Sequence, residues 1–193
     1  MTSVLLTRLA RYNVWAHTQL LQAVKNVSDE HYKAHAGLFF RSIHGTLNHL
    51  LLADKIWYAR LTSAIDTHEY ASNREFWVKT EGQDPHDSTG CIWEEYITNR
   101  KELEKMIIEQ AKLWIPLVAS EPDDLTLSSA VLEHRKMGGT LVRRSKLECL
   151  IHIFNHATHH RGQVTAAITR FGYKSPVLDL AACPPDYDPD EES

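Results

Sequence analysis

The residues best suited to chemistry are four histidines within positions 152–160, in the run His-Ile-Phe-Asn-His-Ala-Thr-His-His. His156 and His160 are four residues apart, so on a helix their imidazoles lie on one face, a turn apart. Two imidazole nitrogens at that spacing can bind one metal ion at little entropic cost, because the helix already fixes the backbone. The pair therefore predicts two ligands of a metal site, and a third ligand has to come from another segment.

The best candidate for that third ligand is His49, in the run Thr-Leu-Asn-His-Leu-Leu-Leu-Ala-Asp at positions 46–54. Three histidines without an evident fourth protein ligand leave a coordination position open, which is typical of catalytic rather than structural metal sites. Imidazole binds zinc, nickel, iron and copper alike. The pattern favours one divalent transition metal, with zinc or nickel first and iron as a further candidate.

Two other histidines, His152 and His159, compete with this set. Together with His156 they also form a stripe along a helix, turned by about 40° from the first pair. We interpret both as residues that hydrogen-bond near the site rather than as ligands. The alternative for His49, His156 and His160 is a set of hydrogen-bonded or solvated side chains without a metal. His44 is predicted to face away from His49, and the remaining histidines are predicted to be solvated. Beyond His159 no general base is evident, so no catalytic residue is assigned.

Three neighbours of these histidines have structural interpretations. Asp54 lies one position off the helix face of His49, which favours a hydrogen bond over metal ligation. Arg161 is predicted to pair with an acidic side chain, and the alternative is that it binds an anionic substrate. Gly162 costs about 1 kcal/mol relative to alanine within a helix, so it is predicted to permit the close approach of a second helix.

Apolar residues that recur every three or four positions predict the elements that carry the histidines. Four amphipathic helices are expected, over residues 5–27, 42–62, 93–116 and 145–171. Thr2 or Ser3 caps the first helix, and Pro116 ends the third. The fourth begins in the capping box Ser-Lys-Leu-Glu at 145–148 and ends before Gly172, which suits the position just past a helix end.

The remaining segments are predicted to connect these helices. Residues 68–90 are polar and are expected to form a loop, whereas residues 125–127 and 140–142 flank a Gly-Gly pair and indicate a short β-hairpin. The predicted fold class is therefore all-α, a four-helix bundle with a short hairpin between its third and fourth helices. Residues 1–182 form one domain, and the acidic, proline-rich residues 183–193 are expected to be an exposed or disordered tail.

The composition is that of an ordinary globular chain: 193 residues, 43% hydrophobic and 24% charged. A formal net charge of -4 argues against a nucleic-acid partner, which usually binds a basic surface. Three widely spaced cysteines indicate neither a disulfide framework nor a zinc knuckle, and they favour a reducing, cytoplasmic location. No apolar run approaches the roughly 20 residues that span a bilayer, so no membrane partner is expected.

Three segments together resemble the DinB/YfiT-like family of metalloenzymes over about residues 5–180. The first is Tyr-Asn-Val-Trp-Ala at 12–16, similar to the family's Tyr/Asn-x-Trp-Ala signature. The second is His49 followed by Ala53, Asp54 and Trp57. The third, His-Ala-Thr-His-His-Arg-Gly-Gln at 156–163, matches the family's His-x-x-x-His-Arg-Gly-Gln motif in full, and it is the specific match.

The resemblance implies an up-down-down-up helix bundle, often dimeric, with one divalent metal bound by three histidines. Carried over position by position, these ligands are His49, His156 and His160. This agrees with the spacing argument, which chose the pair His156 and His160 and left the third ligand open. In such a dimer, Trp77, Trp93 or Trp114 would be candidates for the interface.

The resemblance also implies a reaction class. Some family members are thiol S-transferases that use low-molecular-weight thiols, and others are similar to maleylpyruvate isomerases. The leading hypothesis is a metal-dependent enzyme that acts on a small molecule, as a thiol S-transferase or a hydrolase. The alternative is a non-catalytic, metal-binding dimeric scaffold of a stress response. The expected partners are a small-molecule substrate and a second copy of the chain.

Overall fold

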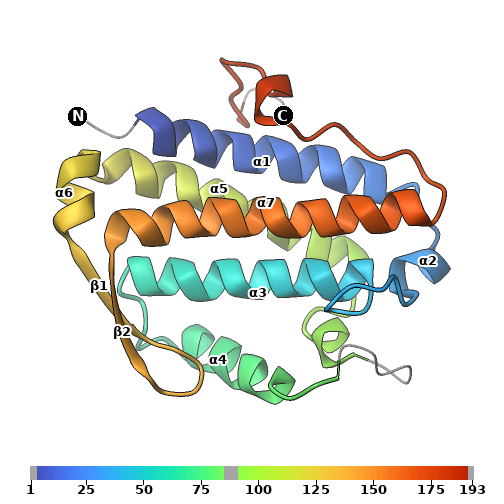
Figure 1. Cartoon of the computed structure of the whole chain (residues 1–193), viewed down its shortest axis with the longest axis horizontal. Helices are drawn as coiled ribbons and strands as arrows, with labels where there is room; N and C mark the ends of the chain where they lie inside the picture. The colour runs from blue at the N-terminus through green and yellow to red at the C-terminus, as the bar shows by residue number, and fades with distance from the viewer. Residues whose placement is uncertain (1–3, 85–90, 191–193) are drawn as a thin grey trace.

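The computed structural model describes residues 4–84 and 91–190 and is mainly helical (Figure 1). Its four long helices are α1 (Val4–Val24), α3 (Ile43–Leu61), α5 (Arg100–Ser120) and α7 (Lys146–Arg170). In Figure 1, α1 and α7 run from left to right, and α3 and α5 run in the opposite direction. Both α1 and α3 contact α5 and α7, so the four helices share one core.

Shorter elements connect the long helices. They are α2 (Asp29–Lys33), α4 (His68–Thr80), the 3-10 helix η1 (Ile92–Glu95), α6 (Asp124–Ser129) and the 3-10 helix η2 (Leu180–Ala182). Strands β1 (Val131–Arg135) and β2 (Leu141–Ser145) form an antiparallel hairpin between α6 and α7. In its register Leu132 lies opposite Arg144, and His134 lies opposite Val142. A hairpin before the last long helix was predicted, and it is confirmed.

Polar side chains set the ends of the two helices that carry the histidines. Ser42 caps α3 by accepting a hydrogen bond from the Gly45 N–H, and Ser145 caps α7 by accepting one from the Glu148 N–H. Gly172 follows α7 with a φ of 82°, a left-handed conformation that glycine adopts without strain. The predicted bounds of both helices are confirmed, whereas the caps proposed for α1 lie outside the described residues.

The apolar faces of the long helices meet in the core. Leu20, Leu51, Ile107 and Ile168, one from each long helix, belong to one cluster of buried side chains. At the end of the molecule where α7 begins, Trp114 is fully buried in a second cluster. Burial at period 3.6 is what the sequence pattern predicts for packed amphipathic helices.

The polar segment 68–90, predicted as a loop, contains helix α4. Thr67 caps this helix by accepting a hydrogen bond from the Tyr70 N–H, and Asn73 accepts one from the Tyr96 hydroxyl at 2.8 Å. Because few of its side chains are buried, α4 shows little hydrophobic periodicity, which is why the prediction was wrong. Residues 85–90 of the predicted loop lie outside the described part of the chain.

Helix α5 continues past Pro116 and ends at Ser120, so the predicted stop was wrong. Proline inside a helix removes one backbone hydrogen bond and crowds the preceding turn, at a cost of about 3 kcal/mol. The last turn nevertheless buries Val118, and Ile115 and Leu117 pack against the same cluster. Apolar packing thus outweighs the local preference.

The first strand of the hairpin lies later in the chain than predicted. Residues 125–127, expected to be extended, belong to helix α6, which Asp123 caps by accepting a hydrogen bond from the Thr126 N–H. The strand itself is β1, and only the second predicted segment, residues 140–142, overlaps a strand of the structure. A cap residue before a short polar run favours a helical turn, and this signal was overlooked.

The end of the chain packs on the helices, contrary to the exposed tail that was expected. Arg8 on α1 donates hydrogen bonds to the carbonyl oxygens of Cys183 at 2.7 Å and Pro184 at 2.6 Å. Cys183 and Tyr187 are buried against α1, so residues 183–190 form part of the packed structure. Within the described ranges, no helix is both long and apolar enough to cross a membrane.

Candidate metal centre

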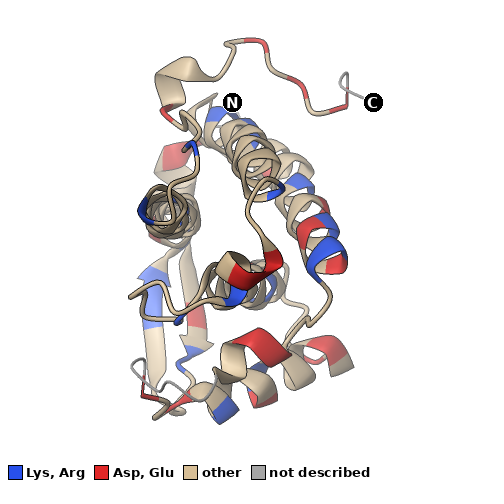
Figure 2. Ribbon diagram, turned by 90° about the vertical axis from the view of Figure 1, so that its right-hand side faces the viewer, with Lys and Arg blue, Asp and Glu red and all other residues tan. Residues whose placement is uncertain are grey.

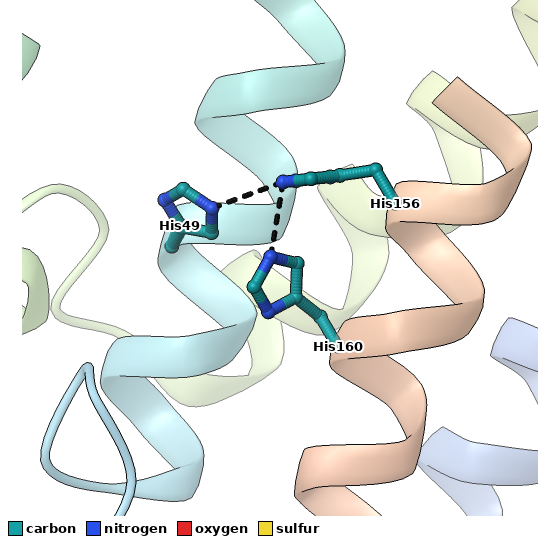
Figure 3. A group of neighbouring side chains, drawn as sticks. All are labelled: His49, His156 and His160. Carbon is teal, nitrogen blue, oxygen red and sulfur yellow. Dashed lines mark hydrogen bonds between the residues drawn. The ribbon is translucent and has the colours of Figure 1, made fainter. Parts of the chain in front are cut away.

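Three histidines from two helices point their side chains toward one another (Figure 3). His49 comes from α3, and His156 and His160 come from successive turns of α7. The Nε2 atom of His156 lies 3.2 Å from Nε2 of His49 and 2.9 Å from Nε2 of His160. One ligand atom of each residue lies within 4.8 Å of the others, close enough for all three to hold one metal ion.

The spacing and the hydrogen bonding fit a metal ion. Nitrogen ligands about 2.1 Å from a tetrahedral ion are about 3.4 Å apart, near the separations found here. His160 makes a 2.7 Å hydrogen bond through Nδ1 with Oε1 of Gln163. An amide oxygen only accepts, so Nδ1 carries the hydrogen and the lone pair of Nε2 is directed into the site.

Burial keeps the three imidazoles in the form that binds metals. Desolvation lowers the pKa of His49 well below the ordinary value of 6.5, and neighbouring histidines lower it further. The same causes lower the pKa of His156 to about 3, and desolvation lowers that of His160. All three are therefore neutral at pH 7, and neutral imidazole is the ligand form.

Aromatic side chains hold His49 in place. Phe40 stacks on its ring at a centroid distance of 3.9 Å, and Trp93 meets the same ring edge-on at 4.7 Å. The Phe40 backbone in turn lies so close to Gly45 that a Cβ there would overlap the Phe40 carbonyl oxygen. The glycine in the first turn of α3 thus permits the loop that positions this wall, a role that the sequence analysis missed.

The two competing histidines lie outside the cluster. His159 is exposed, with its ring 4.9 Å from that of His160, and His152 is exposed between the rings of Trp57 and His156. Neither belongs to the group of nitrogens that could hold one ion. Their placement agrees with the interpretation that neither is a ligand, but within the described residues neither side chain makes the hydrogen bond that was expected of it.

A buried polar cluster lies behind α7. Arg161 is 2% exposed and donates hydrogen bonds to Oδ1 of Asn13 at 2.5 Å and to Thr158 at 3.0 Å, and His17 lies beside it. Asp54 accepts a hydrogen bond from the indole N–H of Trp114 at 3.1 Å, a structural role as expected. Arg161 is also structural, but it contacts an amide rather than the predicted carboxylate.

Three further sequence predictions are corrected by burial. His17, expected to be solvated, is buried. His44, expected to face away from His49, is buried too and hydrogen-bonds through Nδ1 with the Tyr32 hydroxyl at 3.1 Å. Trp93 and Trp114 are buried as well, which removes both as interface candidates. Gly162 faces open space, so it does not serve the close approach of a helix. The type of a single residue does not indicate which element of the folded protein will cover it.

Two cavities reach the histidines. One of about 610 Å³ lies between the hairpin and helices α3, α4 and α7, and its lining includes His49 and His156. Another, of about 300 Å³, reaches His49 from the side of Phe40 and Trp93. A larger hollow of about 690 Å³ between α1 and α5 includes none of the three histidines. A small molecule could therefore approach the cluster from either side.

The fold and the site define a mainly helical protein with a three-histidine cluster that could hold a metal ion. The sequence profile of the DinB family matches residues 1–186, and the chain belongs to that family. It is also 24% identical to Protein DinB of Bacillus subtilis (strain 168) over 172 residues, which cover 89% of each chain.

Gln163 provides a test of the site that leaves the three histidines in place. We expect Gln163→Ala to weaken metal binding by about 10- to 100-fold, because the hydrogen bond that orients His160 is lost. Gln163→Glu keeps an acceptor oxygen and should retain most of the affinity. Competition with a chromophoric chelator measures both constants, and an alanine variant that binds as tightly as the wild type contradicts the orienting role.

Acidification should destabilise the metal-free protein between about pH 7 and pH 4. Burial lowers the folded-state pKa of His17, His49, His156 and His160, whereas in the unfolded chain these groups titrate near 6.5. Below that pH the unfolded chain takes up protons that the folded protein excludes, so stability is lost. Asp54, whose pKa is raised to about 7, acts in the opposite direction, but it is one group against four.

The test is the thermal unfolding midpoint of the metal-free protein across this pH range. The midpoint should fall as the pH falls, and His17→Gln, which removes one of the four groups away from the candidate site, should reduce the slope. A midpoint that rises on acidification would show that the buried carboxyl dominates.

Proposed function

We propose that this chain is a metal-dependent enzyme whose single divalent ion is bound by His49, His156 and His160. The observation that supports this proposal most is that three neutral imidazole nitrogens converge at the end of a cavity that a small molecule can enter. Zinc or nickel is the expected ion, with iron as a further candidate, because imidazole suits all three. The scaffold is an up-down-down-up four-helix bundle, supported by the directions and contacts of the long helices.

The reaction is a thiol S-transfer or a hydrolysis on a small molecule. His49, His156 and His160 would hold the divalent ion, which when bound would supply Lewis acidity and would lower the pKa of a thiol or a water toward pH 7. Three neutral ligands leave its charge uncompensated, which favours an anionic partner. Likeness to family members that use low-molecular-weight thiols supports the first reaction, and no residue is assigned as general base.

The residues of the chain contribute position and exclusion of water. Phe40 and Trp93 cover one side of His49, and Gln163 fixes the ring of His160. His156 lies between the other two histidines. It is only partly buried, and it lines the cavity of about 610 Å³ between the hairpin and the helices. Fixed ligands and a partly dry site lower the cost of reorganisation when charge develops on a substrate.

The decisive experiment is cobalt substitution followed by addition of a low-molecular-weight thiol such as cysteine. We expect a thiolate-to-cobalt charge-transfer band in the wild type, because an open coordination position accepts the sulfur. No change in the spectrum at millimolar thiol would exclude the thiol S-transfer reaction. Hydrolysis would then be tested with ester substrates on the zinc-loaded protein.

Metal removal distinguishes an enzyme from a scaffold that uses its ion for stability. The two main apolar clusters of the long helices contain none of the three histidines, so we expect a chelator to lower the thermal midpoint by only a few degrees while it abolishes turnover. Loss of the fold on chelation would favour a structural ion, because metal-binding energy is then folding energy.

We also propose a homodimer that works in the cytoplasm. The dimer rests on the family resemblance, and sedimentation at several protein concentrations tests it. The location rests on three buried cysteines that form no disulfide, and fractionation of cells tests it.

A further inference from the structure

The larger cavity beside the histidines has a composition of its own. Its apolar wall is made by Ile56, Trp57, Trp77, Met137 and Val142. The same cavity is lined by three basic side chains, Arg60 from α3 and Lys136 and Arg144 from the hairpin, against one acidic side chain, Glu148. Its volume of about 610 Å³ lies within the range of small-molecule sites. A flat apolar body that carries a negative charge fits this lining.

The cations of this cavity lack acidic partners. Among the described residues, none of the three takes part in an ion pair. Arg60 is only 7% exposed, and its guanidinium donates to two neutral acceptors, the Arg135 carbonyl at 2.9 Å and the Tyr70 hydroxyl at 3.4 Å. A buried charge without a counter-charge is costly, and a bound anion would offset that cost.

The three cations face the same space. His134 lies on the inward side of β1, and its pKa is lowered by burial and then by the charges of Arg60, Arg144 and Lys136. Its Nδ1 is buried and has no hydrogen-bond partner within the described residues. Figure 2 shows the basic residues along the hairpin, on the side of the molecule that also carries α4. The hairpin thus brings positive charge and an unpaired polar group to the mouth of the histidine site.

Aromatic rings connect this charge to the histidines. The guanidinium of Arg60 lies 4.9 Å from the ring centre of Trp57, and the Trp57 ring contacts those of His134 and His152 at 4.9 and 5.2 Å. His152 in turn lies 5.6 Å from His156. A bound molecule whose charged end meets Arg60 and the hairpin would therefore lay its body along Trp57, with its far end directed at the candidate metal position.

We propose that this cavity is the substrate site, and that it selects small organic carboxylates with a flat apolar body. The carboxylate binds to Arg60, Arg144 and Lys136, because a guanidinium matches the planar geometry of a carboxylate. The body packs on Trp57 and the apolar wall, and the reacting group lies near His156. The assignment of a substrate rests on the proposed function, but binding of the acid needs no metal.

The probe pair is phenylpropionate and its neutral amide, which share one shape and differ in charge. Calorimetric titration of the metal-free wild type should show the acid bound at least about tenfold more tightly than the amide. Arg144→Gln should weaken binding of the acid by about two- to fivefold, as expected for one exposed charge pair. Arg143→Gln is the matched control, because Arg143 is exposed on the other face of β2 and pairs with Glu133.

Equal binding of acid and amide, no binding of either at millimolar concentration, or an equal loss in both arginine variants overturns the proposal. Metal uptake is measured in parallel, on portions of the same preparations that have been incubated with zinc. Charge-selective binding in a chain that takes up no metal would support the anion site while contradicting the proposed enzyme. Full metal loading without charge-selective binding would support the proposed metal site while contradicting the anion site.

Discussion

His156→Ala should bind almost no metal, where the wild type is expected to carry about one ion per chain. Nε2 of His156 lies 3.2 Å from Nε2 of His49 and 2.9 Å from Nε2 of His160. Without His156, only two histidine nitrogens remain to bind the ion. Loss of an orienting hydrogen bond alone costs about 10- to 100-fold in affinity, and loss of a ligand should exceed that. Mass spectrometry of protein purified without a histidine tag measures the content.

Two neighbouring histidines on the same helix are matched controls for this prediction. His152→Ala and His159→Ala remove exposed imidazoles just outside the cluster, so they should retain the ion. Circular dichroism should show an unchanged helical content for all three variants. Retention of the metal by His156→Ala, or equal loss in the controls, would contradict the ligand set. It would also remove the basis of the proposed enzyme.

Trp114→Ala should destabilise the folded protein by about 3–5 kcal/mol, the usual cost of removing a large buried aromatic side chain. Trp114 is fully buried in a cluster to which α1, α3, α5 and α7 all contribute side chains. Its truncation also deprives Asp54 of the indole hydrogen bond, and it leaves a buried acid without that donor. Urea unfolding measures the loss, and a strongly reduced yield of folded protein is the expected companion effect.

The adjacent Leu113 serves as the control for Trp114. It is 42% exposed, so Leu113→Ala should change the free energy of unfolding by less than about 0.5 kcal/mol. A small loss in Trp114→Ala would show that the surrounding side chains collapse into the cavity. Similar losses in both variants would contradict the packing described for this end of the core.

Local chemistry made part of the structure predictable. The caps at Ser42 and Ser145 and the glycine after α7 satisfy backbone groups within a few residues of themselves, so they can be recognised in the chain alone. The four-residue spacing of His156 and His160 fixes their common face for the same reason. Where that local signal is weak, as in α4, the sequence pattern did not predict the helix.

Long-range packing decided the rest. Pro116 opposes a helix locally, yet burial of Val118 extends α5 beyond it. Phe40 and Trp93 contact His49 although both lie outside helix α3, and no periodic pattern in the sequence places them there. The cavity between the hairpin and the helices exists only once the hairpin folds back along α3 and α7.

The sequence by itself determined the helical class of the protein, the bounds of the two helices that carry the histidines and the common helix face of His156 and His160. These features depend on hydrogen bonds and side-chain periods that span a few residues. The tertiary structure alone decided that His49 meets the pair on α7, that Arg161 is buried beside an amide, and that three cations line the approach to the site. Those contacts join residues far apart in the chain, and their energies depend on burial, which local patterns do not specify.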